Sequence, residues 1–164
     1  NLPSVVDGLG VNVSYNPSNS SEPNGSTSWA VSYTGVEGLT VGYAQDESGA
    51  ATANEYETAY AKYAFGSFTV GVQTSENDED GGSTNDDELE IFGITYQVSD
   101  DLTVGFGNHT LEYNSGEDQE STGVSASYTM GSLTIGGAYN SVDNIANSST
   151  NDRTAYEIGL TFAF

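Results

Sequence analysis

The stretch Tyr156-Glu157-Ile158-Gly159-Leu160-Thr161-Phe162-Ala163-Phe164 alternates strictly between large apolar and small or polar residues. Alternation with a period of two is typical of a β-strand that has one apolar face and one polar face. Five large apolar side chains on one face need a cover, which is either a second sheet or lipid. The remainder of the sequence distinguishes these two possibilities.

Nine further segments with the same alternation precede this stretch and predict an all-β protein. The fourth segment, about 55–65, is read with Ala59, Ala61, Tyr63 and Phe65 on the apolar face, which places Tyr60 and Lys62 on the polar face. The connections alternate in length: tight turns are predicted at 35–38, 66–67, 98–101 and 131–132, and polar loops between them, the longest from Ser75 to Glu88. A motif of Leu or Phe, Thr, Val or Ile, and Gly recurs after the tight turns, which indicates a hairpin repeat of about 30 residues.

Short turns at one end and long loops at the other predict a transmembrane, up-and-down antiparallel β-barrel with about ten visible strands. Aromatic residues lie next to the tight turns, as in the aromatic girdle of such barrels, at Tyr33, Tyr63, Phe65, Phe68, Tyr96 and Tyr128. No run of 18 apolar residues is present, so no transmembrane helix is expected. We expect one barrel domain over 1–164 that lacks its N-terminal strands.

The composition is strongly acidic, with 24 Asp and Glu against 2 Lys and Arg and a formal charge of −22. A nucleic-acid partner is therefore not expected, because phosphate binding needs a basic surface. Cysteine is absent, and the one histidine leaves few options for catalysis, so no enzymatic activity is expected. Most of the acidic residues are predicted to lie in the long loops or at their margins, where they would attract cations to a pore mouth.

Two sets of residues are candidates for function. Parity along the strands predicts a pore-lining position for Tyr60, Lys62, His109, Arg153 and Glu157. The loop from Glu76 to Asp87 partly matches a calcium-binding loop, with Glu76, Asp78, Asp80 and Asp87 as the acidic ligands. No other cofactor is expected, and a solvated acidic loop remains the simpler interpretation of this segment.

The strands of the type Gly38-Leu39-Thr40-Val41-Gly42-Tyr43 and the terminal stretch resemble the general diffusion porins of Gram-negative bacteria, especially the alphaproteobacterial type. The resemblance implies the last ten strands of a 16-stranded barrel, a homotrimer in the outer membrane, and passive diffusion of small hydrophilic solutes. It also implies that Tyr156, Ile158, Leu160, Phe162 and Phe164 form the signal read by the barrel assembly machinery. The acidic residues expected at the pore mouth attract cations and repel anions, so a preference for cations is expected. Two alternatives stay open: a complete ten-stranded barrel with an adhesin or enzyme role, and a soluble acidic extracellular β-adhesin.

Overall fold

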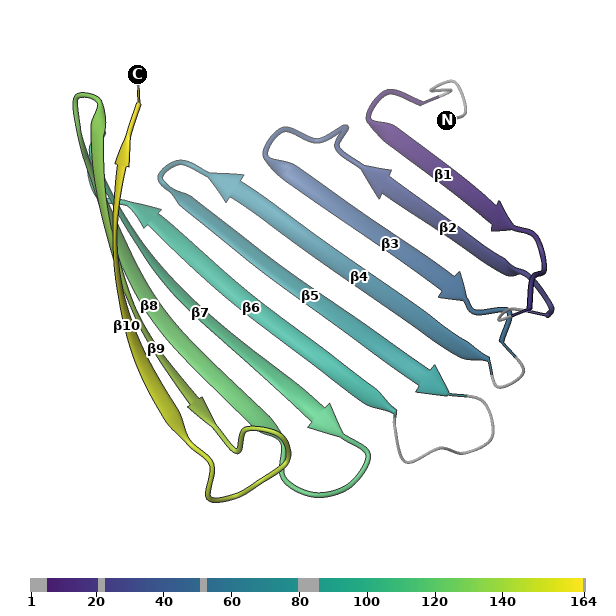
Figure 1. Ribbon diagram of the computed structural model, residues 1–164. Helices are drawn as coiled ribbons and strands as arrows, with labels where there is room; N and C mark the ends of the chain where they lie inside the picture. Colours follow the sequence, from purple (N-terminus) through teal and green to yellow (C-terminus); the bar gives the residue numbers. More distant parts are fainter. Residues whose placement is uncertain (1–5, 21–22, 51–52, 80–85, 164) are drawn as a thin grey trace.

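Ten antiparallel strands form one sheet in which every strand pairs with its neighbours in the sequence. The computed structural model describes residues 6–20, 23–50, 53–79 and 86–163. The strands are β1 (Leu9–Asn16), β2 (Ser26–Tyr33), β3 (Leu39–Glu47), β4 (Asn54–Phe65), β5 (Phe68–Glu79), β6 (Asp87–Gln97), β7 (Leu102–Tyr113), β8 (Gln119–Met130), β9 (Leu133–Asp143) and β10 (Arg153–Phe162). The predicted all-β, up-and-down antiparallel architecture is confirmed (Figure 1).

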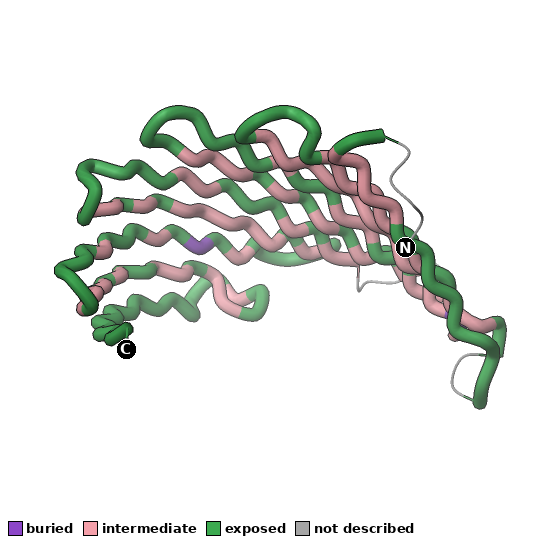
Figure 2. Tube along the Cα trace, turned by 90° about the horizontal axis from the view of Figure 1, so that it is seen from above, coloured by how far each residue is buried: buried purple, intermediate pink, exposed green. Residues whose placement is uncertain are grey.

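The sheet is a single curved layer, and Figure 2 shows its strands following one arc. Among the described residues, no hydrophobic side chain is fully buried. The second sheet that a soluble sandwich would need is not present in this part of the chain. No described helix is long and apolar enough to cross a membrane. The fold therefore has no apolar core of its own among these residues.

The cross-strand register places the large apolar side chains on one face, which we call the apolar face. Along one row, Phe65 pairs with Phe68 and Phe68 with Tyr96; along the next, Tyr63 pairs with Val70 and Val70 with Ile94. Many of these side chains stay exposed, including Val124 at 50% and Ile158 at 83%. Because burial of such area in an apolar medium is favourable, this face is suited to lipid.

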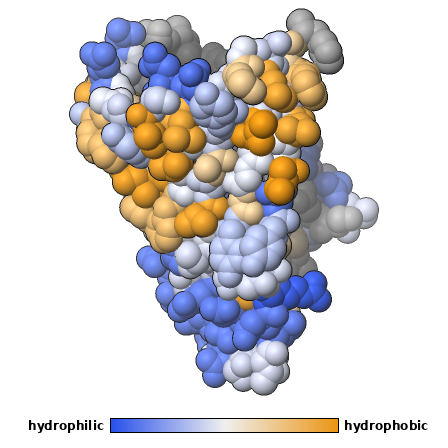
Figure 3. Space-filling model, turned by 90° about the vertical axis from the view of Figure 1, so that its left-hand side faces the viewer, coloured by the Kyte–Doolittle hydropathy of each residue, from blue (hydrophilic) through white to orange (hydrophobic). Residues whose placement is uncertain are grey.

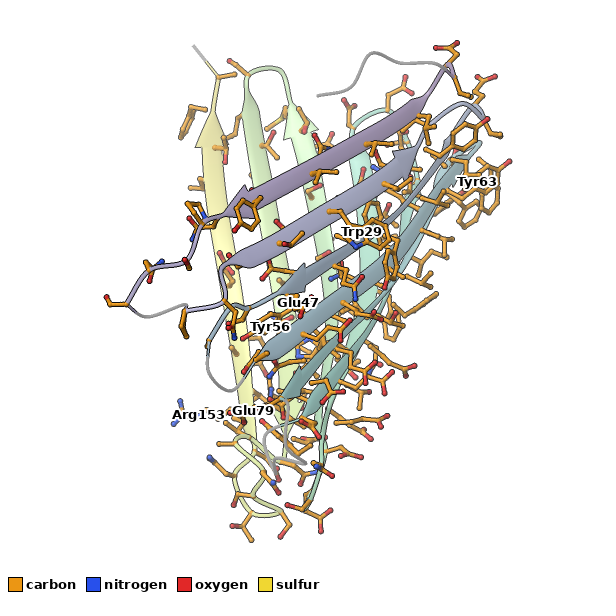
Figure 4. The ribbon with its side chains drawn as sticks, turned by 90° about the vertical axis from the view of Figure 1, so that its right-hand side faces the viewer. Trp29, Glu47, Tyr56, Tyr63, Glu79 and Arg153 are labelled. Carbon is orange, nitrogen blue, oxygen red and sulfur yellow. The ribbon has the colours of Figure 1, made fainter. Side chains whose placement is uncertain are left out.

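The aromatic residues beside the tight turns form a contiguous band. The rings of Tyr63 and Phe65 have centroids 5.5 Å apart, those of Phe65 and Phe68 5.6 Å, and those of Phe68 and Tyr96 4.5 Å. Aromatic side chains concentrate at the boundary between lipid and water, where the hydroxyl groups of Tyr63 and Tyr96 suit the polar side. Figure 4 shows Tyr63 near the turn end of the sheet, with Glu47, Glu79 and Arg153 toward the opposite end.

The tightest turns depend on glycine. Gly66 and Gly131 each begin a two-residue Gly-Ser connection and have φ values of 55° and 62°. A positive φ at the first central residue alone is the type II′ pattern, whose twist matches that of the flanking strands. In the turn before β3, Gly38 also has a positive φ, 77°. Glycine is needed there for a second reason, because a Cβ would lie 2.2 Å from the carbonyl oxygen of Ala64.

The long connections are shorter than expected. The predicted loop from Ser75 to Glu88 is wrong in its bounds, because β5 continues to Glu79 and β6 begins at Asp87. The residues in these extensions are polar and acidic, so they carry no apolar alternation by which a strand is recognised. The backbone pairing nevertheless continues, with Glu76 opposite Glu88 and Asn77 opposite Asp87.

Two connections at the long-loop end are bound to each other. Asn147, between β9 and β10, accepts a hydrogen bond of 2.7 Å from the backbone N–H of Glu117 and donates one to the carbonyl of Ser115, both between β7 and β8. Asn144 donates to the carbonyl of Asp118 at 3.0 Å. Asn144 and Asn147 have positive φ values of 56° and 61°, a conformation that asparagine tolerates. These contacts hold this part of the rim in one arrangement.

The two-faced sheet predicts unequal costs for a charge introduced at neighbouring positions. Val70→Lys, on the apolar face, should lower the free energy of unfolding in lipid vesicles by about 2–4 kcal/mol, the cost of a cation on the lipid side of a barrel. Thr69→Lys, on the other face, should cost about 1 kcal/mol or less, because its ammonium group reaches water. Reversible urea unfolding in vesicles measures both. Equal costs for the two variants would contradict the assignment of the faces.

Candidate pore-lining surface

The face opposite the apolar one, which we call the polar face, carries mainly Gly, Ser, Thr, Ala, Asn and Gln. The register aligns these residues across the sheet, for example Gly105 with Ser125 and Ser125 with Ala138. Side chains of this kind are short and hydrogen-bond well to water. Two hollows of about 520 and 600 Å³ open on this face, so it is the concave side of the sheet.

Tyr60 and Lys62 of β4 both lie on the polar face. Lys62 is opposite Thr40 on one side and Gly71 on the other, and Tyr60 is opposite Gly42. The ring of Tyr60 lies over Gly42, because a Cβ added there would be 2.5 Å from a ring carbon. The glycine at this position therefore allows the tyrosine to lie flat along the wall.

His109, Arg153 and Glu157 lie on the same face at other points of the sheet. His109 is opposite Ile91 and Ser121, and Arg153 of β10 is opposite Val142. Glu157 is opposite Ala138. The structure therefore spreads the predicted lining residues over the wall and does not gather them into a cluster.

The two cationic side chains have no carboxylate partner among the described residues. Lys62 on β4 and Arg153 on β10 are separated by five intervening strands, and neither takes part in an ion pair in this part of the chain. The register partners of Lys62 carry no charge. Each cation is therefore available to solutes on the polar face.

The expectation that most acidic residues lie in the long loops or at their margins differs from what the structure shows. Many lie inside strands, on the same face as the apolar residues and on the long-loop side of them. This outward set comprises Glu47, Glu55, Glu57, Glu76, Asp78, Glu88, Glu90, Glu112, Glu120 and Asp143. On the polar face, the acidic residues within the described strands are only Asp46, Glu79, Asp87 and Glu157. In Figure 3, hydrophobic residues form a broad zone in the upper half of the molecule, and hydrophilic residues cover the lower, long-loop end.

Four of the outward carboxylates form a row across neighbouring strands. Glu57 is opposite Glu76, Glu76 is opposite Glu88, and Glu88 is opposite Glu112. We call these four residues the carboxylate row. Like charges directly opposite each other in a sheet destabilise it. The row lies beyond the apolar band and thus at the height where a lipid bilayer is polar.

The residues of the predicted calcium loop do not share one face. Glu76 and Asp78 point outward, while Asp87 lies on the polar face, and Asp80 is outside the described residues. In the part of the chain that the structure describes, no group of three or more His, Asp or Glu side chains is arranged to hold a metal ion. Calcium binding at this segment stays a prediction, which calorimetric titration with calcium would test.

The residues of the predicted assembly signal lie along the apolar face of β10. Tyr156 is opposite Tyr139, with ring centroids 5.1 Å apart, and Leu160 is opposite Ile135. Ile158 and Phe162 continue the same face, and Phe164 is outside the described residues. The strand thus has the two-faced character that its sequence predicts.

A curved antiparallel sheet that is one layer thick, with an apolar outer face, a polar inner face and an aromatic band, is the wall of a membrane β-barrel. The family model for Gram-negative porins matches residues 2–164. The chain therefore belongs to the Gram-negative porin family, whose members reside in the outer membrane.

One solved structure supports the fold. The anion-selective porin from Comamonas acidovorans superposes with a TM-score of 0.77 at 14% sequence identity. The match covers 97% of this chain and 57% of the Comamonas chain, so this chain spans a little over half of that porin's length. No match was found among curated proteins.

The carboxylate row predicts an unusual gain of stability on removing charge. Glu88→Gln should raise the free energy of unfolding by about 0.5–1 kcal/mol, because Glu88 faces a carboxylate on each side. The gain should shrink in about 1 M salt, where the Debye length is about 3 Å. Glu157→Gln is the matched control, since Glu157 faces Ala138. A loss of stability in Glu88→Gln at low salt, measured by thermal unfolding in detergent, would contradict the repulsion.

Proposed function

We propose that this chain forms part of the wall of a water-filled channel through which small hydrophilic solutes and ions diffuse passively across the outer membrane. The observation that carries the proposal is the division of one sheet into an apolar face and a polar face, in a chain of the porin family. Lipid covers the first face and water the second. The mechanism is physical: the wall excludes lipid from an aqueous path, and no chemical step is proposed.

The polar face supports a wide lumen. A Cβ added to Gly136 or Gly159 would have no atom within 4 Å, so open space lies in front of both positions. Barrels of about eight strands fill their interior with side chains, and residues this small do not fill it. We therefore propose that this sheet is one part of a single barrel domain with more strands than the ten described.

The charges on the polar face support a weak preference for cations. Asp46, Glu79, Asp87 and Glu157 lie on this face, against Lys62 and Arg153. The outward set of carboxylates adds little, because these side chains point away from the lumen and the sheet lies between them and it. The Comamonas porin is named as anion-selective, and at 14% identity that likeness concerns the fold alone.

The proposed partners are outer-membrane lipid, two further copies in a homotrimer, and the barrel assembly machinery. The exposed apolar face supports the first two, since such area needs a cover. The alternation that ends at Phe164 supports the third.

Deleting Phe164 should reduce the amount of folded porin in the outer membrane several-fold, while channels that do insert keep their conductance. Heat-modifiability of the membrane fraction measures the first effect, and planar-bilayer recording the second. Deleting Asn1 is the control at the other end of the chain. Normal membrane levels without Phe164 would contradict the proposed assembly signal.

The reversal potential in a salt gradient tests the selectivity. Wild-type channels should show a modest cation preference, and Glu157→Gln should move the potential toward zero because it removes one of the few carboxylates on the polar face. Glu90→Gln removes an outward carboxylate and should leave the potential unchanged. Anion preference in the wild type, or equal shifts in both variants, would contradict the proposal.

A further inference from the structure

Four glycines line up across the polar face in neighbouring strands. Gly71 of β5 is opposite Gly93 of β6, Gly93 is opposite Gly107 of β7, and Gly107 is opposite Gly123 of β8. We call this row the glycine trough. It runs across the strands, and Lys62 of β4 lies at one end of it, opposite Gly71. Asn140 of β9 lies at the other end, opposite Gly123.

The chain's own packing does not require glycine in most of the trough. A Cβ would come no closer than 3.8 Å to another atom at Gly71, 4.0 Å at Gly93 and 3.6 Å at Gly107, which is ordinary contact. None of the three has a positive φ. Glycine in a strand interior weakens the strand and often marks a place where a ligand approaches the backbone. At these three positions the trough is therefore bare backbone, while the Asn140 side chain lies over Gly123, where a Cβ would be 2.4 Å from its Oδ1.

Polar groups border the trough on both sides. Thr95 and Ser125 lie on the turn side, and His109 and Ser121 lie on the long-loop side, in a hollow of about 600 Å³ that also includes Lys62. The floor thus offers flat backbone, and the borders offer hydroxyl, amide and imidazole groups beside the apolar side chains of Ile91 and Val142. This set of groups suits a solute with many hydroxyl groups.

Ser121 gives an independent indication of a ligand. It is the one buried polar residue among those described, at 9% exposure, and its Oγ has no hydrogen-bond partner. Its register partners are His109 and Val142, which places its side chain on the trough side of β8. A buried hydroxyl without a partner is unfavourable and rare, so a group from outside the chain, water or solute, is the expected partner.

We propose that the glycine trough is a docking subsite for hydroxylated carboxylates about as long as a disaccharide acid; this rests on the channel function proposed above. The solute's carboxylate pairs with the ammonium of Lys62, which has no ion pair among the described residues. Its hydroxyl groups lie toward Ser121 of β8. Four inter-strand spacings separate β4 from β8, or about 19 Å along the sheet, and the lysine side chain shortens the path that the solute must span.

Single-channel recording with lactobionate tests the subsite. Lactobionate should interrupt the current of wild-type channels, while lactose, which lacks the carboxylate, should do so much less. Lys62→Gln should weaken the lactobionate affinity roughly tenfold, the usual effect of losing a hydrogen bond to a charged group. Arg153→Gln is the matched control, because it removes the other cation of the polar face outside the trough, and it should leave the affinity unchanged. Equal weakening in both variants would overturn the subsite.

Two further variants separate binding from folding. Gly93→Val should abolish the interruptions and keep the open-channel conductance, because valine suits a strand and has room at this position. Gly159→Val, elsewhere on the polar face, is its control. Ser121→Ala should weaken the affinity by about threefold or more and leave thermal stability unchanged or higher.

The outcomes distinguish this subsite from the channel itself. Conducting wild-type channels without lactobionate interruptions would overturn the subsite and leave the channel standing. Absence of conductance would overturn the channel function. In that case, calorimetric titration of lactobionate into the detergent-solubilised protein tests the subsite directly, and no heat at millimolar concentration would overturn it.

Discussion

The structure depends on the antiparallel backbone pairing that joins ten strands into one continuous layer. In a lipid medium every backbone N–H and C=O must find its partner inside the protein, because lipid offers none. Once this pairing fixes the layer, the period of two assigns alternate residues to opposite media. A shift of the register by one residue would exchange the two faces, so the pairing determines the function as well as the fold.

The register also sorts the charges. Both cations lie on the polar face, while most of the acidic residues in the strands lie on the outer face beyond the apolar band. The large negative charge of the chain is therefore a poor guide to the charge of the lumen. The acidic surface faces the polar zone at the long-loop end of the barrel, and the polar face keeps a small excess of carboxylates. In this arrangement, a weak preference for cations is compatible with the binding of a solute carboxylate by Lys62.

Much of the fold could be predicted from the sequence, because in a one-layer sheet the residues that face lipid and the residues that face water alternate along each strand. The Gly-Ser turns at Gly66 and Gly131 and the polar-face position of Lys62 follow from local pattern alone. The extensions of β5 and β6 could not be predicted, since acidic residues there replace the apolar signal. The carboxylate row and the glycine trough also needed the structure, because each joins residues from different strands, and alternation within one strand does not fix the register between strands.

The assignment of the two faces is the central claim, and a cysteine scan of β5 tests it most directly. The chain has no cysteine, so each single substitution from Phe68 to Thr74 reports alone. In reconstituted vesicles, a water-soluble thiol reagent should label positions 69, 71 and 73 and spare positions 70 and 72. When a fluorescent label is attached to each cysteine, a quencher carried by the lipid should reduce the fluorescence at positions 70 and 72 and leave it unchanged at positions 69, 71 and 73. Labelling without alternation, or with the opposite phase, would contradict the account.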